Sequence, residues 1–101
     1  MLYRFRSYQL AVGFYRLARA QSAPRYLKDQ FERAASSVAL NLSEGSAKRS
    51  INDRRRYYEI ALGSVRECEA CIALLGKSAS HLEEPCDKLA RHVYRLVQAL
   101  S

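Results

Sequence analysis

Four stretches of the chain place apolar side chains three and four positions apart, and this spacing is the strongest constraint on the fold. Residues at these intervals share one face of an α-helix. The pattern covers residues 5–20, 26–44, 51–77 and 84–100. Only four glycines and two prolines occur in 101 residues, and 49% of the residues are apolar, which is ample for a buried core. We therefore predict an all-α fold, with one domain over residues 1–101.

Short connections join the predicted helices. Gly45 is expected to end the second helix in the left-handed region. Ser50, with Asp53 three residues later, is typical of a helix N-terminus. Gly63 lies in mid-helix, which suggests a close approach of another backbone. Because short loops make consecutive helices antiparallel neighbours, we expect an up-down-up-down four-helix bundle.

The apolar residues of the first and third predicted helices form recognisable faces. In the first, Phe5, Tyr8, Val12 and Tyr15 follow the helical interval, and other apolar residues flank them. This face is wide enough to contact more than one neighbour. In the third helix we assign Ile60 to the buried face.

Small and polar side chains also recur at helical spacing, where apolar ones would be expected to pack. Buried polar groups are costly unless they are paired. We therefore predict a polar network between helices or between subunits. Its members are Gln30, Ser37, Asn41, Glu44, Ser64 and Glu67. A small-molecule site between the helices is the alternative.

The sequence offers little support for catalysis. A catalytic serine needs an activating base, and the two histidines, His81 and His92, lie near or in the fourth predicted helix. The chain has no G-x-S-x-G, H-E-x-x-H or glycine-rich phosphate-binding motif. We therefore expect that the protein is not an enzyme and uses no cofactor.

The three cysteines favour burial over chemistry. Cys68 and Cys71 form a C-x-x-C pair, but they lie within a helical pattern, and Cys86 is the third thiol. A structural zinc site needs four ligands at loop-type spacing. We expect small buried hydrophobic residues and no metal site. An odd number of cysteines, with no apolar run near the ~20 residues of a membrane span and no secretory signal, indicates a cytoplasmic protein.

The net charge of +7 is unevenly placed along the chain. Residues 1–28 hold six basic residues and no acid, and residues 48–56 hold five basic residues and one acid. The remaining segments hold six basic and nine acidic residues. Clustered positive charge is the expected footprint of a polyanionic partner, most often nucleic acid. A solvated surface that aids solubility is the alternative.

Two groups of basic residues are the candidate contacts to phosphate. They are Lys48, Arg49, Arg54, Arg55 and Arg56, and, nearer the start of the chain, Arg4, Arg6, Arg16 and Arg19. Arginine binds phosphate bidentately. Tyr57 or Tyr58, if exposed, could stack on an unpaired base, although core packing is the alternative for both. Without a base-reading motif, binding would depend on phosphates and on salt.

A set of residues over most of the chain matches a known pattern. It comprises Gln30, Arg33, Ala34, Ser37, Val38, Asn41, Glu44 and Gly45, then Lys48, Arg49 and Ser50, then Ala61, Gly63, Ser64 and Glu67. In these residues, and in its opening FRSYQLAVGFYRLAR, the chain resembles a bacterial four-helix bundle family. This family was first noted in proteins encoded by intervening sequences within large-subunit ribosomal RNA genes. Its fold is similar to that of the accessory variability determinant of diversity-generating retroelements.

The resemblance implies a ring-like homopentamer, and the retroelement relatives bind a reverse transcriptase and nucleic acid. We therefore expect a homopentameric accessory protein whose arginines and lysines contact phosphates, of RNA more than of DNA. The alternative is a protein-interaction scaffold that binds a partner protein through the bundle surface. Tyr3, Tyr8, Phe14 and Tyr15 on the first helix are the candidates for that contact.

Overall fold

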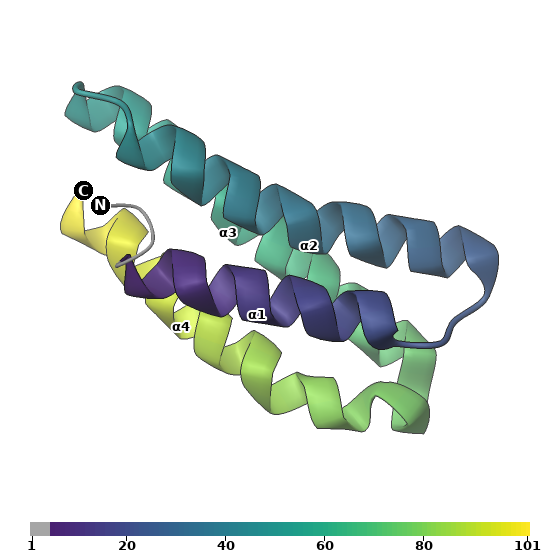
Figure 1. Cartoon of the computed structure of the whole chain (residues 1–101). Coiled ribbons are helices and arrows are strands. Elements are labelled where there is room, and N and C mark those ends of the chain that lie inside the picture. Colours follow the sequence, from purple (N-terminus) through teal and green to yellow (C-terminus); the bar gives the residue numbers. More distant parts are fainter. Residues whose placement is uncertain (1–4) are drawn as a thin grey trace.

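A computed structural model describes residues 5–101, and these residues are almost entirely helical. The helices are α1 (Arg6–Ala20), α2 (Arg25–Ser46), α3 (Ile51–Leu75), the 3₁₀ helix η2 (Gly76–Leu82) and α4 (Glu83–Ala99), as Figure 1 shows. The described part of the chain contains no strand, so the all-α prediction is confirmed. The third helix ends before the predicted boundary at Lys77, because the chain tightens into η2 at Gly76.

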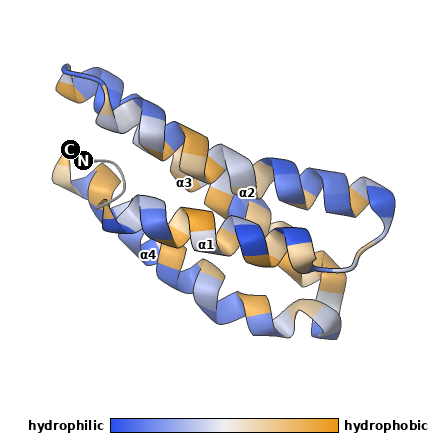
Figure 2. Ribbon diagram, in the orientation of Figure 1, coloured by the Kyte–Doolittle hydropathy of each residue, from blue (hydrophilic) through white to orange (hydrophobic). Residues whose placement is uncertain are grey.

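Each α-helix packs against the next one along the chain, and α4 packs against α1. The molecule is elongated, with extents of 40 × 22 × 19 Å. Figure 1 places the start of α1, the α2–α3 connection and the end of α4 at one end of the long axis, which we call the terminal end. The α1–α2 connection and η2 lie at the other, which we call the far end. Apolar and polar positions mix along every helix in Figure 2, as expected when each helix has one buried face.

Large side chains from α2, α3, η2 and α4 fill the centre of the core. The largest fully buried ones are Phe31, Leu42, Leu82, Leu89, Val38, Val65 and Val93. The rings of Phe14 and Phe31 meet edge to face, with centroids 5.9 Å apart, which is a favoured aromatic geometry.

The first helix buries a different stripe from the predicted one. Its buried residues are Ser7, Ala11, Phe14 and Ala18, whereas Phe5, Tyr8, Val12 and Tyr15 are only partly buried. Small residues let α1 lie close to its neighbours, and tyrosine rings at the edge of the core keep their hydroxyl groups near water.

The structure gives Gly45 and Gly63 roles that differ from the predicted ones. Gly45 lies inside α2, without the left-handed backbone predicted for it, and it is buried. A Cβ atom there would lie 2.7 Å from Cε1 of Tyr58 and 3.1 Å from Cβ of Tyr57. Gly63 is exposed, and a Cβ atom there would meet no atom within 4 Å, so the predicted close approach at Gly63 is wrong. Of these two positions, only Gly45 lies where the close packing of α2 and α3 requires a glycine.

A glycine ends α3, and the segment after it is also helical. Gly76, with φ of 70°, ends α3 and is the one described residue with left-handed backbone. The segment after it is η2, which buries Ala79 and Leu82. Ile60 is 43% exposed and does not belong to the buried face of α3.

Replacing Gly45 and Gly63 by alanine, one at a time, gives a matched test of the α2–α3 contact. Gly45→Ala should lower the free energy of unfolding by about 1–3 kcal/mol, because the buried Tyr58 ring must move. Gly63→Ala should raise it by about 0.5–1 kcal/mol, since helix propensity improves and nothing clashes. Urea unfolding of both variants measures the difference. Equal stability of the two variants would show that α2 and α3 are not closely packed at Gly45.

Candidate nucleic-acid interface

The α2–α3 connection carries the first predicted cluster of cations, and local structure fixes its shape. Ser50 caps α3, and its Oγ accepts a hydrogen bond from the Asp53 N–H at 3.3 Å, as the sequence predicted. Lys48 is ion-paired to Glu44 at 3.2 Å, and its Nζ lies 5.3 Å from the Tyr57 ring centroid. The hydrogen bond with Glu44 raises the pKa of Lys48, so this lysine is positively charged but shares its charge with a carboxylate.

The three arginines at the start of α3 differ in their availability. Arg54 is partly buried, and its Nη2 donates to the Lys48 carbonyl oxygen at 2.8 Å. Arg55 is also partly buried, with its Nε 3.7 Å from Oε2 of Glu59. Arg56 is exposed, and its guanidinium carbon lies 4.8 Å from the Tyr57 ring centroid. Arg49 is also exposed, so Arg49 and Arg56 are the most accessible cations of this cluster.

The two tyrosines that follow have different surroundings. Tyr58 is buried, its ring centroid lies 6.2 Å from that of Phe5, and burial raises its pKa. It belongs to the core, so stacking of Tyr58 on a base is ruled out as an interpretation. Tyr57 is partly exposed, but Lys48 and Arg56 both lie against its ring. The face of the ring attracts both cations electrostatically.

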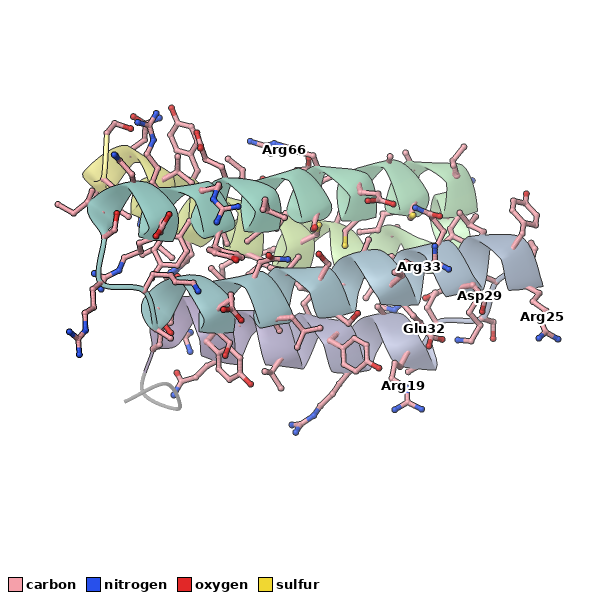
Figure 3. The ribbon with its side chains drawn as sticks, turned by 90° about the horizontal axis from the view of Figure 1, so that it is seen from above. Arg19, Arg25, Asp29, Glu32, Arg33 and Arg66 are labelled. Atoms are coloured by element: carbon pink, nitrogen blue, oxygen red, sulfur yellow. The ribbon has the colours of Figure 1, made fainter. Side chains whose placement is uncertain are left out.

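The predicted arginines of α1 do not form one group. Arg6 lies in the first turn of α1, at the terminal end, together with the α2–α3 connection. Arg16 and Arg19 are exposed in the last turns of α1, nearer the far end, and Figure 3 shows Arg19 projecting there. The guanidinium carbon of Arg19 lies 5.9 Å from the Tyr15 ring centroid. Arg4 lies outside the described residues.

A second cationic cluster, which the sequence analysis missed, lies on α4. Lys88, Arg91 and Arg95 are exposed, and the partly buried His92 lies among them. Burial, followed by the charges of Arg95, Arg6, Lys88 and Arg91, lowers the pKa of His92 below its ordinary value. The signal was present in the sequence, because no Asp or Glu occurs after Asp87.

Three of the predicted polar residues meet at the α2–α3 contact. The hydroxyl oxygens of Ser37 and Ser64 are 2.8 Å apart and share a hydrogen bond. The Asn41 Nδ2 group donates to the Ser37 carbonyl oxygen at 2.8 Å and to the Ser37 hydroxyl at 3.0 Å. Ser64 is buried, whereas Ser37 and Asn41 are partly buried.

The other three predicted members lie outside this network. Glu44 is exposed and pairs with Lys48. Gln30 is exposed and Glu67 is partly buried, and within residues 5–101 no hydrogen bond joins either of them to the two serines. We conclude that the network is a short hydrogen-bonded link between two helices, with one edge open to solvent.

The comparison with known families agrees with the residues that carry the resemblance. A family model described as 23S rRNA-intervening sequence protein matches residues 4–101. The chain belongs to this family. No curated protein matches the chain.

The thiols and carboxylates of this family member offer no metal centre in residues 5–101, where no group of three or more His, Cys, Asp or Glu side chains could hold a metal ion. Cys68, Cys71 and Cys86 are free and buried. Burial raises the pKa of Cys86 to about 12, and it raises the pKa values of Cys68 and Cys71 as well. These thiols are therefore neutral and poor nucleophiles. In the same described part, no helix is long and apolar enough to cross a membrane.

A double-mutant cycle on the two serines tests the link between α2 and α3. Ser64→Ala should lower the free energy of unfolding by about 1 kcal/mol, since the Ser37 hydroxyl loses a partner. The coupling energy between Ser37→Ala and Ser64→Ala should be at least about 0.5 kcal/mol. Thermal and urea unfolding of the four proteins measure it. Additive effects of the two substitutions would mean that the hydrogen bond contributes nothing to stability.

Proposed function

We propose that this protein is a non-enzymatic, homo-oligomeric nucleic-acid-binding accessory protein that contacts phosphates of RNA, in preference to DNA, with clustered arginines and lysines. The observation that carries the proposal is the gathering of cations at one end of the molecule. The terminal end gathers cations from three separate segments of the chain. They are Arg6, Lys48, Arg49, Arg54, Arg55, Arg56 and Arg95.

Carboxylates balance these cations only in part. Glu44, Asp53 and Glu59 are the acids of the α2–α3 region, and two of them pair with Lys48 and Arg55. Most other acids lie towards the far end, where four of them line an open cleft beside η2. These four are Glu69, Glu83, Glu84 and Asp87. A polyanion approaching this protomer would therefore meet the stronger attraction at the terminal end, because at the far end these acids offset the charges of cations such as Arg19, Arg25 and Lys77.

Phosphate contacts of this kind suit flexible, single-stranded RNA. They do not recognise particular bases. Exposed Arg49 and Arg56 can each offer a planar guanidinium to a phosphate. The sequence contains no recognised base-reading motif. Affinity is then set mainly by counterion release and falls steeply with salt.

Oligomerisation would bring together several copies of this weak phosphate-binding site. We propose that the chain forms an up-down-up-down four-helix bundle as one protomer of a homopentamer, the number of subunits being the one that the family resemblance implies. Supporting this, α2 and α3 expose five large apolar side chains: Tyr26 (78% exposed), Leu40 (67%), Ile51 (61%), Ile60 (43%) and Leu74 (74%). Leu40 follows Ser37 by three residues and Ile60 precedes Ser64 by four, so both lie beside the hydrogen bond that joins α2 and α3. Five linked sites would bind one long polyanion with avidity.

A protein-interaction scaffold is the second candidate, with a partner such as a reverse transcriptase. It is favoured by α1, where Leu17 is 41% exposed and Tyr8 and Tyr15 are partly exposed. Phe14, which the sequence analysis included in this surface, is buried and cannot take part. Partners that remain bound after nuclease treatment would favour the scaffold, and partners released by it would favour nucleic acid.

Molar mass tests the assembly. The protein should sediment at micromolar concentration as an oligomer of its 11.5 kDa protomer. Leu40→Lys combined with Leu74→Lys should shift it towards the single protomer, since each buried charge would face an apolar neighbour. Leu17→Lys on α1 is the control and should leave the mass unchanged. A wild-type mass of 11.5 kDa would contradict the assembly.

Salt dependence tests the phosphate contacts. Arg49→Gln combined with Arg56→Gln should weaken binding to single-stranded RNA of any sequence. It should also flatten the slope of log K against log salt by about 1.4, at ~0.7 for each phosphate that is no longer neutralised. Arg25→Gln combined with Lys77→Gln removes the same charge from the far end, where Figure 3 shows Arg25, and should leave the slope unchanged. Fluorescence anisotropy over a salt series measures both. Identical slopes in the two double variants would contradict the assignment of the terminal end.

A further inference from the structure

The cluster around His92 gathers cations from two helices of the described residues, with few carboxylates near them. On α4, Lys88 precedes His92 by four residues and Arg95 follows it by three, so all three side chains leave the same face of the helix. From α1, which packs against α4, Arg6 lies close enough for its charge to act on His92. Two helices therefore direct cations towards one partly buried imidazole.

Carboxylates are scarce around this cluster. Helix α1 contains no Asp or Glu, and α4 contains none after Asp87. Asp87 is ion-paired to Arg91, which is the fourth cation acting on His92. Helix α3 packs on another side of α4, where Arg66 and Glu69 act on Cys86. In η2, the titratable group nearest to His92 in the sequence is His81, which lies at the far end.

This arrangement of cations suits an anion. Because a histidine lies among the cations, binding of the anion should depend on pH. We propose that Arg6, Lys88, His92 and Arg95 form a binding site for a phosphate group of nucleic acid on the α1–α4 seam, and that filling this site protonates His92. The proposal rests on the proposed nucleic-acid binding and names the surface that performs it. The basic linker between α2 and α3 then acts as a second, proton-independent contact.

The linkage follows from charge alone. In the free protein, the neighbouring cations and burial keep the imidazole neutral at pH values where an ordinary histidine is partly charged. A phosphate placed among Arg6, Lys88 and Arg95 offsets those charges and attracts the imidazolium form. His92 then takes one proton from solvent. By reciprocity, a bound phosphate raises the proton affinity of His92 and a bound proton raises the affinity for phosphate.

The same reasoning gives the sign of the effect on stability. The pKa of His92 is lower in the folded chain than in the unfolded chain, so the unfolded state binds more protons as the pH falls through the ordinary histidine range. Acidification therefore destabilises the free protein through this residue. A bound polyanion reverses that contribution, because its negative charge stabilises the protonated form of His92.

The two histidines of the chain allow a direct experiment on the full-length protein. The probe is an oligouridylate, which has no secondary structure of its own to titrate. The imidazole resonances of His92 and His81 are followed by NMR from about pH 8 to about pH 5, without and with saturating probe. We expect the pKa of His92 to rise on binding, whereas the resonances of His81, the internal control, should not respond to the probe. Affinity should increase towards lower pH, by at most about tenfold per pH unit for one proton.

Variants separate the possible outcomes. His92→Gln should lose the extra pH dependence, so that its affinity for the probe changes less between about pH 8 and about pH 5 than that of the wild type. Arg6→Gln combined with Arg95→Gln should weaken binding at every pH, whereas Arg25→Gln combined with Lys77→Gln should not. If the probe binds while the pKa of His92 stays fixed, this site is wrong and the proposed function stands. If no probe binds at low salt, both are overturned.

Discussion

The close contact between α2 and α3 is the constraint on which the rest of the molecule depends. At the terminal end, Gly45 lets the buried Tyr58 ring lie directly against the α2 backbone. Further along, small hydroxyl side chains replace bulky ones, and Ser37 and Ser64 bond to each other. Because both features need helices at short separation, they fix how α3 leaves the connection that follows α2. That connection in turn sets where Lys48 and the α3 arginines lie.

Helical spacing was sufficient to predict the all-α class, because three-four intervals recur in every segment and so few residues break them. It was insufficient to assign roles to glycines. Gly45 and Gly76 both lie near the end of a helix, and the absence of a Cβ atom serves either a left-handed cap or a close contact. Only the packing of Tyr58 separates these two uses. The phase of α1 was wrong for a related reason, since aromatic residues outweigh alanines in a search for an apolar face, whereas space selected the alanines.

The basic linker shows how counting charges overstates a binding surface. The pairs Glu44–Lys48 and Arg55–Glu59 are four residues apart, so their partial neutralisation could have been inferred from spacing. The hydrogen bond from Arg54 to the Lys48 carbonyl could not, because it depends on the path of the loop. On α4 the opposite error occurred. Its early acids hid the cations that follow Asp87, and only the approach of α1 brings Arg6 to them.

The burial of all three thiols has a consequence for any assembly of this chain. Copies cannot be joined by disulfides between their surfaces while the fold is intact, since each sulfur is enclosed within its own protomer. Association must then be reversible, and dilution must favour separate chains. If the proposed assembly forms, its extent would therefore depend on the concentration of the protein, and a long polyanion that holds several copies together would raise it without any covalent chemistry.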